Sequence, residues 1–285
     1  MRSFALITIL LGVVFAAGIP AYAQDDSQGP IAPPPAYKIN RIPSTPHPGP
    51  PPIPVQEIIQ KFAANEDIAK KVYDTYDFTQ TVRIEEIGGE GGKFTVVGVE
   101  YTRPDGQRYW RVEKQPASTL KSESYTLEDV NTMISIPLIF LTTDEIPNYD
   151  FVYAGQQQLD QLNTYVFQVK PKMLSRKRLF FQGVINVDDH DLAIVETYGK
   201  FVSELADAGF KLPFSLFEVY RENFQGKYWL PTYVSSDDYI NQTDGSDPLH
   251  LRMVIHSTDF KLNPSQPAPV QTPPPGPSLQ QSPPH

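Results

Sequence analysis

Apolar and polar residues alternate through much of residues 55–261, which predicts a chain rich in β-strands. The stretches 94–102 and 108–113 flank "RPDGQ", and "LFEVYRENF" and "YWLPTYV" flank "QGK", so each pair is typical of a hairpin. Two further strands each have one wholly apolar face, made of Tyr165, Phe167 and Val169 in the first and of Leu249, Leu251, Met253 and Ile255 in the second.

Helical spacing is confined to two segments. Residues 55–73 repeat apolar positions at helical intervals directly after Pro54, and "TLEDVNTMI" opens with Thr126 and Asp129 at capping-box spacing. The predicted order is a helix, several antiparallel strands, a second helix and more antiparallel strands. This order predicts a mainly β (α+β) fold, with a single curved antiparallel sheet and a few helices packed on one face.

The polar stretch "DDHD", residues 188–191, is either a metal site or a turn. Apolar residues flank it at strand spacing, and facing Val187 with Leu192 brings Ile185 opposite Ile194 and Phe181 opposite Tyr198. This register needs a four-residue connection, which "DDHD" supplies. Asp is favoured in turns because its side chain accepts hydrogen bonds from nearby backbone amides. We therefore predict a turn and no metal site.

The two ends of the chain differ from its middle in composition. Arg2, an apolar run and an A-x-A pattern ending at Ala23 are typical of a signal peptide over residues 1–23, cleaved after Ala23. Residues 24–54 hold 11 of the 29 prolines and residues 262–285 hold 9, so both are predicted to be disordered. The predicted folded domain is residues 55–261, exported and without a transmembrane segment once the signal peptide is removed.

The composition also limits the chemistry. The chain has no cysteine, which excludes disulfides, Cys nucleophiles and Cys-based metal sites. Its formal net charge of −9, without a basic stripe, argues against binding to nucleic acid. The loop "GGEGGK" lacks the Ser or Thr and the following helix of a phosphate loop, and no catalytic triad or elbow motif is present. We predict no catalytic residue, no metal and no cofactor, and so not an enzyme.

One short segment is strongly basic. The stretch "KPKMLSRKR" is either a solvated loop or a contact for anionic headgroups or an acidic partner, through Lys170, Lys172, Arg176, Lys177 and Arg178.

Several strand motifs together resemble a known family. The segments "YDTYDFTQTVRIEEI", "LNTYVFQVKPK", "FFQGVINVDDHDLAIVETYGK" and "QGKYWLPTYV" are similar, in their order, to those of bacterial outer-membrane lipoprotein-sorting proteins of the LolA/LolB-like group. The resemblance covers roughly residues 73–260. It implies an open half-barrel whose concave side is covered by helices, a hydrophobic cavity for acyl chains, and neither catalysis nor a cofactor.

The resemblance and the apolar face of the sheet lead to the same expectation. We expect a periplasmic binding protein that holds acyl chains of a lipid or lipoprotein, because an incompletely covered concave face leaves an apolar pocket. The alternative is a structural or regulatory envelope interaction module, with a filled core and an envelope protein as its partner. The residues expected on the cavity wall or near it are Tyr165, Phe167, Val169, Ile185, Ile194, Phe217, Trp229 and Tyr233.

Overall fold

The computed structural model describes residues 46–88, 91–121, 124–135, 138–176, 178–204, 214, 216–240 and 248–265. Its elements in chain order are α1 (Val55–Asp74), β1 (Tyr76–Glu86), β2 (Lys93–Thr102), β3 (Arg108–Lys114), α2 (Leu127–Ser135), the 3-10 turn η3 (Ile146–Asn148), β4 (Tyr149–Leu159), β5 (Leu162–Pro171), β6 (Phe180–Asp188), β7 (Ile194–Val202), β8 (Phe217–Phe224), β9 (Tyr228–Ile240) and β10 (Leu249–Leu262). None of the described helices combines the length and the apolarity that a membrane crossing needs.

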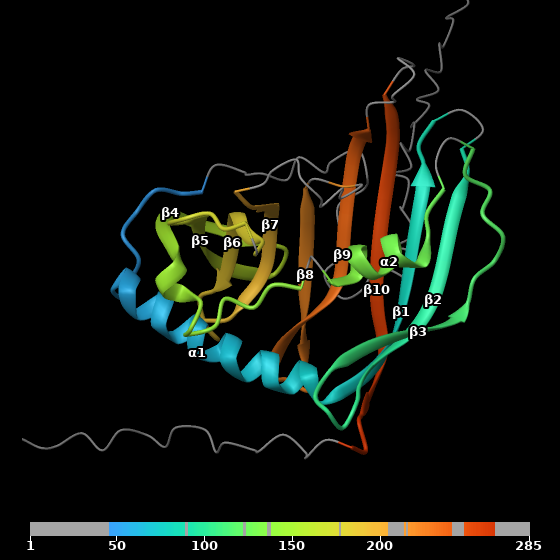
Figure 1. Ribbon diagram of the computed structural model, residues 1–285. Coiled ribbons are helices and arrows are strands. Elements are labelled where there is room, and N and C mark those ends of the chain that lie inside the picture. Colours follow the sequence, from blue (N-terminus) through green and yellow to red (C-terminus); the bar gives the residue numbers. More distant parts are fainter. Residues whose placement is uncertain are drawn as a thin grey trace, which may run out of the picture.

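The strands form one antiparallel sheet in the order β3-β2-β1-β10-β9-β8-β7-β6-β5-β4 (Figure 1). Strands β3 and β4 stand at its two ends and are not paired with each other, so the sheet is open. Both hairpins predicted from the alternation are present, as β2–β3 and β8–β9. The prediction of a mainly β fold with one curved, open antiparallel sheet is confirmed.

Both predicted helices are present and lie on the same face of the sheet (Figure 1). Helix α1 begins after Pro54, whose carbonyl accepts hydrogen bonds from the amides of Glu57 and Ile58. Helix α2 begins at the predicted capping box, where the Thr126 amide donates to the Asp129 carboxylate at 2.7 Å and the Asp129 amide donates to the Thr126 hydroxyl at 3.2 Å. Such reciprocal bonds satisfy amides that a helix start leaves without partners.

Each helix covers its own part of the sheet. Helix α1 packs on β4–β7 in a cluster that we call the α1 core: Ile58, Ile59, Phe62, Ala63, Leu141, Tyr149, Tyr165, Phe167, Val169, Phe180, Phe181, Ile185, Val187 and Ile194. Helix α2 packs on β1, β2 and β8–β10 in the α2 core, which contains Val130, Met133, Ile134 and inward-facing strand residues such as Phe217, Leu251, Met253 and Ile255. The last turns of α1 also pack on β1 and β9 in a third cluster, with Tyr73, Phe78 and Leu230. The inner face of the sheet is thus covered in three sections.

Two glycines let β6 and β7 approach closely where the sheet curves over α1. Gly183 and Gly199 are directly paired across the two strands. A Cβ atom on Gly183 would lie 2.1 Å from the Tyr198 carbonyl oxygen and 2.9 Å from the ring of Phe181. The Phe181 ring therefore occupies the space that side chains at both glycines would need, and paired glycines permit the bend.

The predicted register of the β6–β7 hairpin is wrong. The connection runs over residues 189–193, and Val187 pairs with Ile194, Ile185 with Thr197 and Phe181 with Phe201. A β-bulge between these pairings inserts one extra residue into β7. One inserted residue reverses the facing of every later side chain, so Tyr198 points to the outer face, and Phe201 packs on the inner one.

Contacts of the fold extend beyond residues 55–261 at both ends. The backbone of His47 exchanges two hydrogen bonds with Gln156 of β4, at 2.8 and 3.2 Å. The buried Asn263 side chain donates to the Asp77 carboxylate at 2.6 Å and to the Thr102 carbonyl at 2.7 Å. Composition could not reveal these bonds, because prolines dominate both flanks. Residues 1–45, which include the predicted signal peptide, and residues 266–285 lie outside the described residues.

Candidate functional site: an apolar cavity on the inner face

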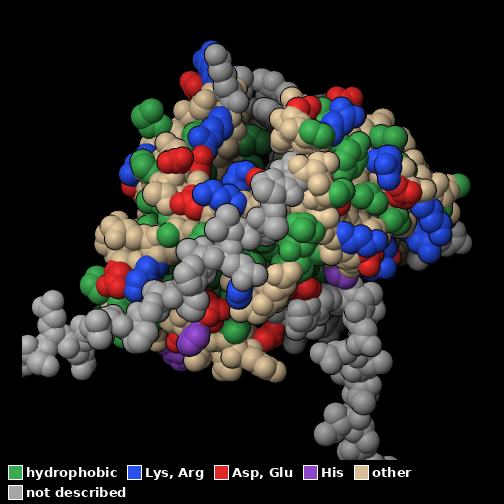
Figure 2. Space-filling view, turned by 90° about the horizontal axis from the view of Figure 1, so that it is seen from below, with side chains coloured by type: hydrophobic (Ala, Val, Ile, Leu, Met, Phe, Trp, Pro, Cys, Tyr) green, Lys and Arg blue, Asp and Glu red, His purple; other side chains and the backbone are tan. Residues whose placement is uncertain are grey.

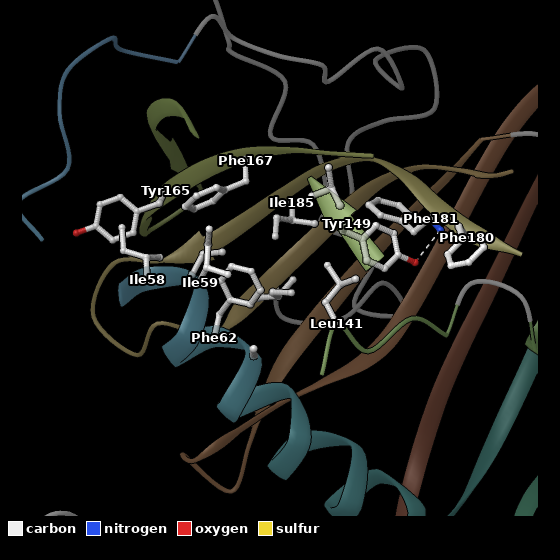
Figure 3. Packing of buried hydrophobic residues seen from close by; sticks show 14 residues of the cluster. Ile58, Ile59, Phe62, Leu141, Tyr149, Tyr165, Phe167, Phe180, Phe181 and Ile185 are labelled. Atoms are coloured by element: carbon white, nitrogen blue, oxygen red, sulfur yellow. Dashed lines mark hydrogen bonds between the residues drawn. The ribbon is translucent and has the colours of Figure 1, made fainter. Parts of the chain in front are cut away.

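Five of the residues expected on a cavity wall lie in a tightly filled core. Tyr165, Phe167, Val169, Ile185 and Ile194 are each at most 3% exposed and belong to the α1 core. Figure 3 shows the rings and aliphatic side chains of this core meeting between α1 and the sheet. The shared face predicted for these residues is correct, but α1 fills the space in front of it.

Helix α1 reaches this face chiefly through Phe62. Its ring centroid lies 5.6 Å from that of Phe151 and 6.1 Å from that of Phe167, and Tyr153 is 5.5 Å from Phe167. Tilted and edge-on contacts at such distances are favourable arrangements for aromatic rings.

The other three expected wall residues lie elsewhere. Phe217 belongs to the α2 core. Trp229 packs in a small cluster with Val195, and its indole N–H donates to the Asp191 carboxylate at 2.9 Å. Tyr233 faces outward, with its ring 6.1 Å from that of Tyr220. The eight residues therefore do not line one common space.

A cavity of about 360 Å³ lies beside the α1 core. It is partly open to solvent and is bordered by the last turns of α1, the irregular segment 138–145 and the neighbouring ends of β4, β6 and β7. We call it the inner cavity, and its lining is mostly apolar: Leu138, Ile139, Phe140, Tyr149, Leu179, Phe181 and Phe201, with Lys70, Ser135, Thr142, Glu145 and Arg178.

A buried ion pair holds the cover of the inner cavity in place. Glu66 of α1 and Arg221 of β8 form a two-pronged pair, with side chains 2% and 1% exposed. Arg221 also donates to the Ile139 carbonyl at 2.8 Å, and the Leu141 amide donates to Glu66 at 3.1 Å. The pair thus satisfies polar backbone groups of a segment that has no regular structure of its own.

Burial raises the pKa of the Glu66 carboxyl, and the positive charge of Arg221 opposes that rise. The sequence did carry a signal for this pair. Glu66 stands in line with Phe62 and Ala69 on the apolar face of α1, and Arg221 has the strand parity of Val219. An inward acid on a helix and an inward base on a strand stay buried only when paired.

The basic segment 170–178 does not form one patch. Lys172 donates to the Pro147 carbonyl at 2.9 Å, Arg176 lies 3.5 Å from the Glu204 carboxylate, and Lys177 lies outside the described residues. Among the basic residues of this segment that the structure describes, only Arg178 lines the inner cavity, where it pairs with Glu145. Figure 2 shows a similar mixture over the underside of the molecule, where Lys and Arg side chains are interspersed with Asp, Glu and apolar ones.

A second hollow lies on the face of the sheet that points away from the helices. We call it the outer groove; its volume is about 600 Å³, and its lining includes Lys170, Val152, Val184, Tyr198, Lys200 and Leu216 from β4–β7 and the start of β8. Val152 is 54% exposed and Leu216 38% exposed, so apolar surface is accessible to solvent here.

The "DDHD" stretch forms the predicted turn. The Asp188 carboxylate accepts the amides of His190 and Asp191, at 3.2 and 2.6 Å. Within the described part of the chain, Asp188, His190 and Asp191 are the one group whose ligand atoms gather within 4.8 Å, as a metal ion would require. Their oxygens already accept backbone amides and the indole of Trp229, so their positions are explained by the turn.

Comparison with known proteins was informative only at the level of structure. No family model matches the sequence, and no curated protein matches it. The solved structures that the chain resembles include a LolA superfamily protein from Nitrosomonas europaea, with 13% identity and a TM-score of 0.35 over 74% of this chain and 94% of that one.

Two further structures are similar to the same extent. A DUF1329 family protein from Desulfovibrio piger has 13% identity and a TM-score of 0.34, over 73% of this chain and 95% of that chain. An outer-membrane lipoprotein-sorting protein domain from Vibrio parahaemolyticus has 11% identity and a TM-score of 0.33, over 71% of this chain and 94% of that chain. Similarity at this level assigns no ligand, partner or residue role to this chain.

Proposed function

We propose that this protein is a non-enzymatic binding protein of the periplasm, and that it holds an acyl chain of a lipid or lipoprotein in the inner cavity. The observation that carries the proposal is the cavity itself, about 360 Å³ in volume, whose lining is mostly aromatic and aliphatic with charged groups along one part of it. Such a concave, mostly apolar space with a few charged groups is the usual form of a small-molecule site. The signal-peptide pattern before Gln24 supports an exported protein.

The energetics suit a single acyl chain. Each methylene removed from water contributes about 0.8 kcal/mol, so about ten methylenes contribute roughly 8 kcal/mol before the costs of association. The cavity is near the lower end of the range of about 300–1,000 Å³ for small-molecule sites, which favours one chain over several.

The outer groove favours a second candidate function. A filled α1 core and exposed Val152 and Leu216 on the opposite face suit a module that docks an envelope protein. In that case the inner cavity would have no ligand, and the sheet would serve as a rigid support for the outer groove.

Titration with a fluorescent fatty acid separates the two functions. The wild-type protein is expected to show saturable binding at one site, and Leu138→Trp is expected to abolish it, because the larger side chain fills the inner cavity. Leu216→Trp is the matched control, since it adds the same side chain to the outer groove. Both variants are expected to melt within a few degrees of the wild type, because both leucines lie at the edges of hollows.

Absence of saturable binding by the wild type would overturn the proposed function. Loss of binding in Leu216→Trp, with full binding in Leu138→Trp, would place the ligand in the outer groove and contradict the proposed site.

A further inference from the structure

Arg178 stands at the edge of the inner cavity in a defined position. Its guanidinium carbon lies 4.6 Å from the centroid of the Phe180 ring, and its side chain forms an ion pair with Glu145. Phe180 is itself held by Tyr149, with ring centroids 6.0 Å apart. Arg178 thus rests on a buried aromatic surface and presents its charge beside the apolar wall.

From this placement we infer that the ligand of the inner cavity is a single acyl chain with an anionic end group, and that this group binds Arg178 in place of Glu145. The inference rests on the proposed function and names the class of its ligand. The shared chemistry is a carboxylate or a phosphate, as in a free fatty acid or a single-chain phospholipid.

Two cations line the cavity, Lys70 and Arg178, and Arg178 is paired there with Glu145. Lys70 is bound to Asp74 at 2.8 Å, on the helix surface. A guanidinium presents two parallel N–H groups that match a carboxylate or a phosphate, which makes Arg178 the specific contact.

The ion pair between Arg178 and Glu145 is placed so that a ligand anion can replace Glu145. Arg178 is 44% exposed and Glu145 26% exposed, so both groups are in reach of water, and an exposed pair is worth little net free energy. Glu145 belongs to the short connection before η3, which follows the cavity-lining Thr142. An incoming anion attached to a buried acyl chain replaces Glu145 at little electrostatic cost, because one anionic partner is substituted for another.

The buried acyl chain also makes the exchange favourable. Once the chain lies against Phe181, Phe201 and Leu179, its end group is confined near the guanidinium. Confinement raises the effective concentration of the anion at Arg178 far above that of an untethered ion. Glu145 is likewise confined next to Arg178 in the protein without ligand, and so it competes with the incoming anion. Replacing Glu145 with an uncharged residue is therefore expected to strengthen anion binding.

The experiment compares oleate, lysophosphatidylglycerol and oleyl alcohol as competitors of a neutral fluorescent acyl probe. Oleate is expected to bind the wild type about tenfold more tightly than oleyl alcohol, since its carboxylate accepts charge-assisted hydrogen bonds from Arg178. Arg178→Gln is expected to remove this difference and to leave the affinity for oleyl alcohol unchanged. Arg176→Gln, which alters a surface pair with Glu204, is the matched control.

Glu145→Gln gives a second, independent measurement. It leaves Arg178 in place and is expected to increase the affinity for oleate severalfold, with no change for oleyl alcohol. This variant also tests the inference if Arg178→Gln folds poorly. A response to Arg178→Gln with lysophosphatidylglycerol but not with oleate would support the inference and identify phosphate as the end group.

The negative outcomes are distinguishable. Equal affinity of the wild type for oleate, lysophosphatidylglycerol and oleyl alcohol, unaffected by Arg178→Gln and Glu145→Gln, would overturn the inference and leave the proposed function intact. Failure of all three competitors and of the neutral probe to bind would overturn the proposed function as well.

Discussion

The inner face of the sheet has two neighbouring regions built on the same strands, one filled and one hollow. Under α1, the rings of Phe62, Phe151 and Phe167 lie against one another. Next to them, under residues 138–142, a cavity of about 360 Å³ remains. Alternation along the strands decides which side chains point inward, but the cover decides whether those side chains form a core or a wall.

Helix α1 and segment 138–142, which cover the two regions, differ in how their backbone amides and carbonyls find hydrogen-bond partners. A helix bonds its backbone internally and can give one whole face to apolar contacts. The irregular segment cannot, and it depends on Glu66 and Arg221 for the Leu141 amide and the Ile139 carbonyl. The hollow region is therefore held by polar bonds at a few points, and the filled region by packing throughout.

The largest effect is expected from Arg221→Met. This change removes the guanidinium that pairs with the buried Glu66 carboxylate and donates to the Ile139 carbonyl, and breaking a buried ion pair typically costs about 3–5 kcal/mol. We expect the free energy of unfolding, measured with urea, to decrease by an amount near the top of that range, and acyl binding to become weaker. A stability within about 1 kcal/mol of the wild type would show that the pair does not hold the cover.

Phe167→Ala tests the filled region. Because Phe167 is fully buried, the change is expected to cost about 3–5 kcal/mol in free energy of unfolding. Acyl affinity, measured where the variant remains folded, is expected to stay the same. A small loss of stability together with a large change in affinity would mean that Phe167 is a cavity wall after all.

Phe201→Ala is the counterpart in the hollow region. Phe201 lines the inner cavity and is only partly buried, so its ring is packed less completely than that of Phe167. We expect the free energy of unfolding to decrease by about 1–2 kcal/mol, less than for Phe→Ala in a filled core, and the affinity for the acyl chain to decrease clearly. Equal losses of stability in Phe167→Ala and Phe201→Ala would remove the distinction between the two regions.

The smallest effect concerns pH. Burial raises the pKa of Glu66 above its ordinary value of 4.5, so this group stabilises the folded state below that value and the contribution is lost as pH rises through the folded pKa. The difference in free energy of unfolding between the wild type and Glu66→Gln is therefore expected to decrease as pH rises from 4.5. A difference that increases with pH would show that attraction by Arg221 outweighs burial.

Much of the fold could be predicted from local pattern. Alternation located the hairpins β2–β3 and β8–β9, and the capping box located the start of α2, because these signals depend on neighbours in the sequence. The common face of Tyr165, Phe167 and Val169 was also predictable. Local pattern failed in the β6–β7 hairpin, where the pairing next to the turn is two residues away from the predicted one and a bulge adds one more residue to β7.

The site was predictable only in part, because a cavity depends on what covers a face. The sequence indicates that Phe167 points inward, but not that Phe62 of a helix far away in the chain fills the space before it. Residues 138–142 belong to no predicted element and still form one wall of the cavity. Glu66 and Arg221 had a readable signal, as inward charges on otherwise apolar faces.

The most direct test of the central claim is methyl NMR with a stearate that carries a nitroxide near its chain end. The claim is that an acyl chain binds in the inner cavity, so the methyl signals of Leu138 and Leu179 are expected to broaden on addition of the ligand. Those of Val152 and Leu216 in the outer groove, across the sheet, are expected to broaden less. Broadening confined to Val152 and Leu216, or none at any of the four residues, would contradict the claim.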